Sequence, residues 1–463
     1  MALGSAARDK AVVVSRRRGT RSPPKQHHGT ANLYGRPLTL SARAVDRRPP
    51  SESYVLLGLA SAGYFLFTFT WFSLAAFLPP VIEELGLTST QAGIVSGAIQ
   101  LSYIPLSLVS GLVIDRLGSR SALGAGLFVI GAAHVVRGLP TGFVTILLPT
   151  LLIGVGGMAV TFGLPKLVSE LFPPERSGTM SSVYMIGATL GSATVFAVAR
   201  PLIGPFVGGW RPFFWYTGAV VVGFAAVWTV ASWYLWGRID EFPAQADDQT
   251  FSLASMREDL VSVVTHYGLF LVVIVATLRL FITHGLSSWL PTILEARGVT
   301  PTLAGTLTSL FILVRVLGIV SVPVLSDRFS TRRLPIVACG LAGTLGLLGL
   351  VVAGGVWTLT LSLVLIGTFV IGGLSPLVRA LPIEMAGIGP RLTAVATGLM
   401  FTFGEVGGFA GPFLIGALRD LTGAFAPSLV VLAVASLGTA VAGYFMDEPA
   451  EAEYAESAAE PTD

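Results

Sequence analysis

Apolar segments of about twenty residues recur along residues 51–446, and short polar turns separate them. A helix needs about twenty apolar residues to cross the roughly 30 Å hydrocarbon layer of a bilayer. The pattern predicts twelve membrane-spanning helices, at about 54–78, 90–113, 121–138, 142–164, 178–204, 213–236, 267–292, 303–325, 334–353, 357–378, 394–418 and 426–446. Because backbone groups in lipid must be hydrogen-bonded internally, the predicted fold class is an all-α membrane protein.

Composition and motifs exclude several kinds of chemistry. Charged residues make up 12% of the chain, about half the fraction typical of soluble domains. The single cysteine, Cys339, lies in an apolar run, so neither a disulfide within the chain nor a cysteine-ligated metal is expected. Lys10, Lys25 and Lys166 are followed by Ala, Gln and Leu, so the chain has no phosphate-binding G-K-[ST] loop. We therefore expect no enzyme, no metal and no cofactor.

Charge divides the chain into five parts. Residues 1–50 are predicted to form a disordered basic tail, and residues 447–463 a disordered acidic tail. The polar stretch 237–263 separates six predicted helices from six, so it is the predicted linker between the halves 51–236 and 264–446. The basic tail has two interpretations, a nucleic-acid or lipid-binding arm and a plain cytoplasmic tail, and the positive-inside rule favours the second.

Lysine and arginine in the short loops set the predicted orientation. With both termini in the cytoplasm, eleven of these bases fall on the inner side. Five fall on the outer side: Arg137, Arg200, Arg211, Arg297 and Arg419. Because basic loops resist translocation, the prediction is a multi-pass plasma-membrane protein with cytoplasmic termini.

An internal repeat relates the two predicted halves. Residues 78–93 read LPPVIEELGLTSTQAG, and residues 290–305, at an offset of 212, read LPTILEARGVTPTLAG. At the same offset Asp115 matches Asp327 and Arg120 matches Arg332. Two parallel repeats of six helices predict a substrate site near the bilayer midplane, where the halves meet.

The loop after the second predicted helix resembles the signature of the major facilitator superfamily. The matching residues are Gly111, Asp115, Arg116, Gly118 and Arg120, and a second copy keeps Asp327, Arg328 and Arg332, with Pro323 and Ser330 in place of the glycines. The resemblance covers residues 51–446 and implies a major facilitator fold. It also implies that these loops latch the cytoplasmic ends of the halves together in the outward-facing state. For the same residues, an ordinary basic turn is the alternative.

Three segments resemble the anion-transporting branches of this superfamily, namely the anion:cation symporters and the nitrate or cyanate permeases. They are residues 164–176, 289–292 and 408–423. Drug:proton antiporters of the superfamily carry a Gly-Pro pair in the fifth helix, whereas here such a pair, Gly411 and Pro412, lies in the eleventh. The resemblance therefore favours a small anion over a drug.

Charges at mid-membrane depth mark candidate functional residues, because an ionisable group there is costly. Arg279, Arg315 and Glu405 lie near the centres of the seventh, eighth and eleventh predicted helices. Two cations and one carboxylate leave a formal charge of +1, and arginine suits an oxyanion because its planar fork binds two oxygens. We expect Glu405 to pair with one arginine, and either to carry a coupling proton or to act as a structural partner.

Polar stripes mark the opposite wall of the predicted site. In the first half the substrate-facing candidates are Gln100 and Tyr103 on the second predicted helix and Tyr64 and Trp71 on the first. On the tenth, Thr368, Gly372, Ser375 and Arg379 share one face. Such stripes must face protein or water rather than lipid, although small residues also serve helix packing.

The sequence thus predicts a secondary transporter of a small anion, a carboxylate or inorganic oxyanion. It is expected to work by alternating access, to act as a monomer in the lipid bilayer and to bind no nucleic acid. Coupling to a proton or sodium is expected, but symport, exchange and export are not separable. Two alternatives remain: export of another small molecule, and a non-transporting receptor or scaffold protein on the same fold.

Overall fold

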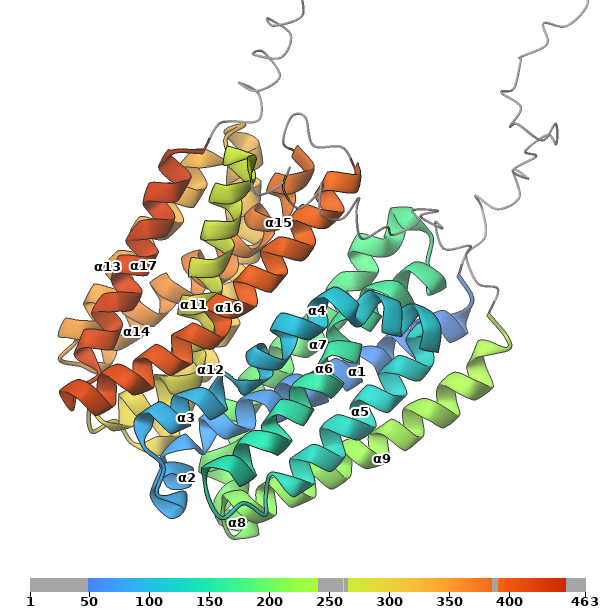
Figure 1. Cartoon of the computed structure of the whole chain (residues 1–463), viewed down its shortest axis with the longest axis horizontal. Coiled ribbons are helices and arrows are strands. Elements are labelled where there is room, and N and C mark those ends of the chain that lie inside the picture. Colours follow the sequence, from blue (N-terminus) through green and yellow to red (C-terminus); the bar gives the residue numbers. More distant parts are fainter. Residues whose placement is uncertain (1–48, 240–260, 262–264, 385–389, 447–463) are drawn as a thin grey trace, which may run out of the picture. The chain divides into compact units, whose positions relative to one another are not determined.

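The computed structural model describes residues 49–239, 261, 265–384 and 390–446. Residues 1–48 of the predicted basic tail at 1–50, the predicted acidic tail at 447–463 and most of the predicted linker at 237–263 lie outside these ranges. Regular structure in the described residues is entirely helical (Figure 1). Eleven helices are long and apolar enough to cross a membrane, and α4 makes a twelfth if its two bent parts count as one span. The prediction of an all-α membrane protein is confirmed.

The helices of the first half follow the predicted order, with extra breaks. They are α1 (Ser51–Ala76), α2 (Leu78–Leu85), α3 (Ser89–Ser96), α4 (Ala98–Leu117), α5 (Ser119–Val136), α6 (Phe143–Leu171), α7 (Pro174–Val198), the π-helix η1 (Ala199–Ile203), α8 (Gly204–Val207) and α9 (Trp210–Trp236). α5 packs beside α9, and α1 beside α7.

The second half repeats this arrangement. Its helices are α11 (Tyr267–Glu295), α12 (Pro301–Arg328), α13 (Arg333–Val352), α14 (Val356–Leu365), the π-helix η2 (Ile366–Gly373), α15 (Leu374–Glu384), α16 (Pro390–Thr422) and α17 (Ala426–Tyr444). α13 packs beside α17, as α5 does beside α9 (Figure 1). Following the predicted orientation, we call the end that carries α2 and η1 the outer end. The end that carries residues 115–120 and 326–333 is called the cytoplasmic end.

The second predicted span, 90–113, is the one that differs most from a straight helix. α3 ends at Ser96, and α4 begins after Gly97, whose φ of −90° and ψ of 0° lie outside the helical region. Within α4, Ala98–Ser107 and Val109–Leu117 are inclined by 78°. Pro105 lies just before this bend, and proline removes a helical hydrogen bond and clashes with the preceding turn.

One large hydrophobic cluster joins the two halves. It combines residues from the outer part of the first half, such as Phe77, Phe196 and Phe213, with residues of α11 to α17 such as Trp289. A second cluster contains first-half residues, among them Phe172 at the cytoplasmic end of α6, together with Ile239 just after α9. The shared core therefore lies where the outer part of the first half meets the second half.

Candidate functional site

Arg315 lies on α12 and reaches into the first half. Its Nη2 donates a 2.5 Å hydrogen bond to Oγ1 of Thr189 on α7, and Thr189 in turn donates to the carbonyl oxygen of Met185. Gly372 permits η2 to pack against this part of α12, because a Cβ at position 372 would lie 2.2 Å from the carbonyl oxygen of Arg315. Nε of Arg315 is buried without a protein partner. The guanidinium therefore bridges the halves and keeps an unused donor.

Arg279 belongs to the same positively charged region. It lies on α11, and its charge interacts with those of Arg315, Arg379 and Glu405. Its Nε is buried without a hydrogen-bond partner. Arg379 on α15 also interacts with the charge of Arg315, and its guanidinium carbon lies 5.8 Å from the ring centre of Phe401. Arg279, Arg315 and Glu405 alone give the predicted formal charge of +1, and the exposed Arg379 adds one unit.

Glu405 lies on α16 among buried polar groups from both halves. A Cβ added to Gly408 would lie 3.1 Å from Cγ of Gln100, 3.1 Å from Cδ2 of His284 and 3.2 Å from Oε2 of Glu405. The side chains of Gln100, His284 and Glu405 therefore lie close together beside Gly408. Oε2 of Glu405, both amide atoms of Gln100 and Nδ1 of His284 are buried without a protein hydrogen-bond partner.

Buried polar atoms without partners are rare in folded proteins and need an explanation. The expected ion pair is not formed in this conformation, since no arginine of the described chain lies within 4.0 Å of the Glu405 carboxylate. Arg279 is the cation whose charge acts on Glu405. Solvent or a bound solute would satisfy these atoms.

Aromatic residues pack against the polar groups near Glu405. The ring of Trp71 on α1 stacks on His284 of α11, with centroids 5.6 Å apart and planes at 3°. Trp71 also meets Tyr103 edge-on at 5.9 Å, and the hydroxyl of Tyr103 lies 3.0 Å from Oγ1 of Thr161. Trp71 and Tyr103, two of the candidates from the first half, are thus in contact with each other.

Tyr64 lies deeper in the first half. Its ring stacks near those of Phe67 and Tyr184, at 6.1 and 5.9 Å, and its hydroxyl interacts electrostatically with Arg315. The structure therefore brings the six predicted substrate-binding residues and Glu405 into two neighbouring groups. One surrounds Arg315, and the other surrounds Glu405. The predicted substrate-binding residues did not include Arg379, Thr189 or His284. The polar stripe on the tenth predicted helix was the available signal for Arg379.

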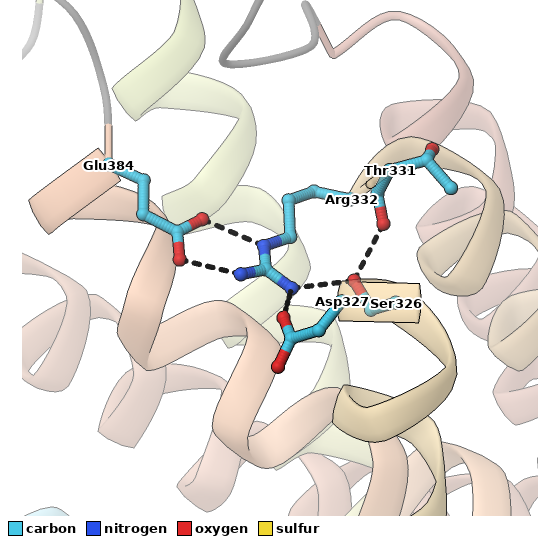
Figure 2. Close-up of polar contacts among 5 residues, drawn as sticks. All are labelled: Ser326, Asp327, Thr331, Arg332 and Glu384. Carbon is cyan, nitrogen blue, oxygen red and sulfur yellow. Dashed lines mark hydrogen bonds and ion pairs between the residues drawn. The ribbon is translucent and has the colours of Figure 1, made fainter. Parts of the chain in front are cut away.

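The second copy of the loop signature forms a compact network at the cytoplasmic end (Figure 2). Nε and Nη2 of Arg332 each donate a 2.8 Å hydrogen bond to one carboxylate oxygen of Glu384 at the end of α15. Nη1 donates to Asp327 at 2.5 Å and to Ser326 at 2.7 Å, and Ser326 donates to the carbonyl of Thr331. Glu384, and then Asp327, raise the pKa of Arg332 above its usual range. Arg332 therefore ties α12, the turn and α15 together.

The first copy has a looser arrangement. Asp115 is paired with Lys166 of α6, and Ser119 donates to Glu170 of the same helix. Arg120 lies over the ring of Trp236, at 5.2 Å. The carboxylate-bearing side chain of Asp115 is 64% exposed, and its ion pair lies within the first half. The latch between halves remains a prediction for the outward-facing state.

The remaining signature residues shape the turns. Gly118 has φ of 77°, and Ser330, which replaces the matching glycine, also has a positive φ, 48°. The repeat therefore preserves this left-handed backbone even where the residue changes. Gly111 has open space around its Cα, and Arg116 and Arg328 are exposed.

At the outer end, polar contacts join the halves directly. The carboxylate of Asp420, near the end of α16, accepts hydrogen bonds from the backbone N–H groups of Ser89 and Thr90, at 2.9 and 2.7 Å, and from the Thr90 hydroxyl at 2.6 Å. It thus caps the N-terminus of α3, where an anion is favoured. Arg200 of η1 forms an ion pair with Glu295 at the end of α11.

A large apolar pocket lies away from these groups. It has a volume of about 330 Å³ between α11 and α16, and Phe270, Leu278 and Phe403 are among its lining residues. None of the charged residues described above lines it. It offers contacts to hydrocarbon and not to a charged solute.

Three curated relatives match most of the chain. "Uncharacterized transporter YycB" of Bacillus subtilis is 27% identical over 79% of this chain and 87% of its own length. "Probable sulfoacetate transporter SauU" of Cupriavidus necator is 24% identical over 85% and 94%, and the "Glycerol-3-phosphate transporter" of Bacillus subtilis is 25% identical over 79% and 85%.

A solved structure and a family model complete the comparison. A bacterial homologue of the human lysosomal transporter Spinster, in an inward-facing and unoccupied conformation, superposes with a TM-score of 0.68 at 16% identity, over 86% of this chain and 98% of that one. The model of the Major Facilitator Superfamily matches residues 60–412 and 290–461. These matches point to a transporter and not to an enzyme. The chain belongs to the Major Facilitator Superfamily.

Proposed function

We propose that this transporter moves a small anion across the plasma membrane by alternating access and couples that movement to protons. The observation that carries the proposal is the pair of partly buried arginines Arg279 and Arg315, which share this region with a single buried carboxylate of the described chain, Glu405, and with the exposed Arg379. Buried charges are stable only when they are paired or hydrogen-bonded. A solute with one or two negative charges would neutralise this region.

The relatives support the chemical class. Sulfoacetate and glycerol 3-phosphate, in the names of two relatives, are both small organic anions. The hydroxyls of Tyr64, Tyr103 and Thr189 and the amide of Gln100 add neutral hydrogen-bonding groups near the arginines. Such groups suit a small, oxygen-rich anion better than a bulky apolar one.

Glu405 supplies a means of coupling. It shares Arg279 with the proposed substrate position, because the charge of Arg279 acts on Glu405 while its Nε keeps an unused donor. An anion that binds Arg279 would weaken the attraction between this arginine and Glu405 and favour protonation of the carboxylate. Binding one anion would then accompany binding one proton.

The contacts between the halves support alternating access around this region. We propose that residues 51–236 and 264–446 move as two bodies, with both termini in the cytoplasm. The Asp420 hydrogen bonds, the Arg200–Glu295 ion pair and the shared hydrophobic cluster close the outer end in this conformation. Opening the outer end requires these contacts to separate, while the site between the halves stays in place.

Thermal stabilisation of the purified protein by a panel of anions would test the proposal. A ligand that binds only the folded state raises the apparent melting temperature. We expect a carboxylate, sulfonate or phosphate ester to stabilise the wild-type protein, and Arg315→Gln or Arg279→Gln to abolish the effect. Lysine at either position should restore it poorly, because an ammonium lacks the planar fork.

The exposed Arg238, stacked on Tyr234, provides a matched control. Arg238→Gln removes the same charge from the surface and should leave the anion effect unchanged. Stabilisation by cationic or neutral solutes alone, or retention of the anion effect in both Arg279→Gln and Arg315→Gln, would refute the anion site.

A further inference from the structure

Arg137 is a fully buried arginine outside the region just described. It follows the last residue of α5 and was predicted to lie in an outer loop, but its side chain is 0% exposed. Nη2 donates 2.8 Å hydrogen bonds to the carbonyl oxygen of Thr70 and to Oγ of Ser73, both on α1. Its guanidinium carbon lies 4.9 Å from the ring centre of Phe214. These contacts hold the guanidinium of Arg137 against α1.

The charge of Arg137 has no partner of opposite sign in the described chain. No carboxylate lies within ion-pair distance, and the adjacent buried His134 uses Nε2 for Thr217. Nε and Nη1 of Arg137 are buried without hydrogen-bond partners, and so is Oγ of Ser96. A buried cation needs a compensating negative charge, and the carbonyl contacts supply only partial charges.

Arg137 lines a small cavity. Its lining includes Arg137, Ser96 of α3, Thr150 of α6, Trp71 of α1 and Ser288 of α11, and no acidic residue. Its volume of about 10 Å³ is roughly the space that one water molecule needs. An organic acid does not fit, and a monatomic anion such as chloride, which is larger than a water molecule, fits when the lining side chains move slightly outward.

We propose that this cavity is a binding site for a small monovalent anion of chloride size, held by Arg137 and the hydroxyl of Ser96. It is distinct from the central site, since none of Arg279, Arg315, His284 and Glu405 lines this cavity. Ser288 comes from the second half, so the site is complete only while α11 packs against α1, α3 and α6. The ion therefore stabilises the conformation with a closed outer end.

The melting temperature of the purified full-length protein tests this site without a transport assay. Sodium chloride replaces sodium gluconate at constant ionic strength, so that only the anion changes. We expect a saturable, chloride-dependent rise in the melting temperature of the wild type. Radioactive chloride should bind with a stoichiometry of one ion per chain in equilibrium dialysis.

Two variants and one control test whether chloride binds in the cavity beside Arg137. Arg137→Gln should abolish chloride binding. Ser96→Val keeps the arginine but fills the cavity and removes the hydroxyl, and it should raise the half-saturating chloride concentration at least tenfold. If Arg137→Gln does not fold, Ser96→Val decides alone. Arg315→Gln, which alters the central site, should retain the chloride effect.

The contradicting outcomes are distinct from failure of the proposed function. A wild type that does not respond to chloride would show that the carbonyl groups of α1 suffice for Arg137, and would overturn the site. An unchanged response in Ser96→Val would overturn it as well. A response lost in Arg315→Gln but kept in Arg137→Gln would place chloride in the central site, and would support the anion preference there.

Discussion

At the scale of single residues, Glu405 decides whether anion movement is linked to protons. Glu405→Gln keeps the shape of the side chain and resembles its protonated form. We expect this variant still to bind the anion and to exchange it downhill, because the arginines remain. It should lose accumulation driven by a pH gradient, since the residue cannot release a proton. Proteoliposomes with and without an imposed pH gradient would measure both activities.

The exposed Glu175, in the first turn of α7, gives a control for this experiment. Glu175→Gln removes one carboxylate from the cytoplasmic end and should leave accumulation intact. If Glu405→Gln continues to accumulate the anion against its gradient, Glu405 carries no coupling proton and is a structural partner of Arg279.

Charged residues inside apolar segments could be located from the sequence because their cost in lipid is independent of tertiary contacts. This reasoning identified Arg279, Arg315 and Glu405. It failed for Arg137, which stands at the end of an apolar run and therefore resembled an ordinary loop residue. Its burial depends on α1 and Phe214, which are distant in sequence. Buried polar atoms without a hydrogen-bond partner, such as those of the Gln100 amide, are likewise identified only when the packing of the two halves is known.

At the scale of elements, the cytoplasmic network in Figure 2 is expected to hold α12 and α15 together. The two hydrogen bonds between Arg332 and Glu384 are charge-assisted and parallel, and both side chains are mostly shielded from solvent, with 20% and 30% exposure. We expect a coupling energy of about 1–2 kcal/mol between Arg332→Ala and Glu384→Ala. A double-mutant cycle of unfolding free energies in denaturant would measure it.

Arg328 lies four residues before Arg332 and is exposed at the end of α12, so it offers a matched cycle. Arg328→Ala combined with Glu384→Ala should be additive within about 0.5 kcal/mol. Additive effects in the Arg332 cycle too would mean that solvent screens the pair, and that α15 is held by its apolar contacts alone.

The existence and order of the membrane helices could be predicted from apolar segment length, but their breaks could not. The end of α3 at Ser96 and the start of α4 after Gly97 lie within one continuous predicted span. Close packing requires a glycine at position 97, since a Cβ there would lie 2.9 Å from the ring of Phe409 on α16. Hydropathy contains no information about that neighbour.

At the scale of the whole molecule, the repeat at an offset of 212 predicted two related halves, and family membership confirms the fold. The conformation was not predictable, because the same sequence must form both the closed and the open outer end. Only contacts between distant residues, such as Asp420 with the start of α3, distinguish the two states. The resemblance to the superfamily predicts a latch at Asp115, whereas the contacts of Asp420 were not predicted.

These two aspartates should therefore act in opposite directions on the balance between conformations. Asp420→Asn removes the charge that caps α3 and should shift the population toward an open outer end. Asp115→Asn should favour the closed outer end, provided that Asp115 stabilises closure of the cytoplasmic side. A difference of 1.4 kcal/mol changes the ratio of the two states about tenfold.

Distances between spin labels at the outer end would reveal these shifts. The single cysteine, Cys339, is buried and can be replaced by alanine, and the exposed Thr141 and Gly354 can then carry the labels. In this background Asp420→Asn should increase the fraction of long distances, whereas Asp115→Asn should reduce it. Because both changes remove one charge and keep the side-chain shape, a general loss of stability would move the two distributions alike. Parallel shifts, or unchanged distances in Asp420→Asn, would show that the apolar cluster and the Arg200–Glu295 pair close the outer end without Asp420.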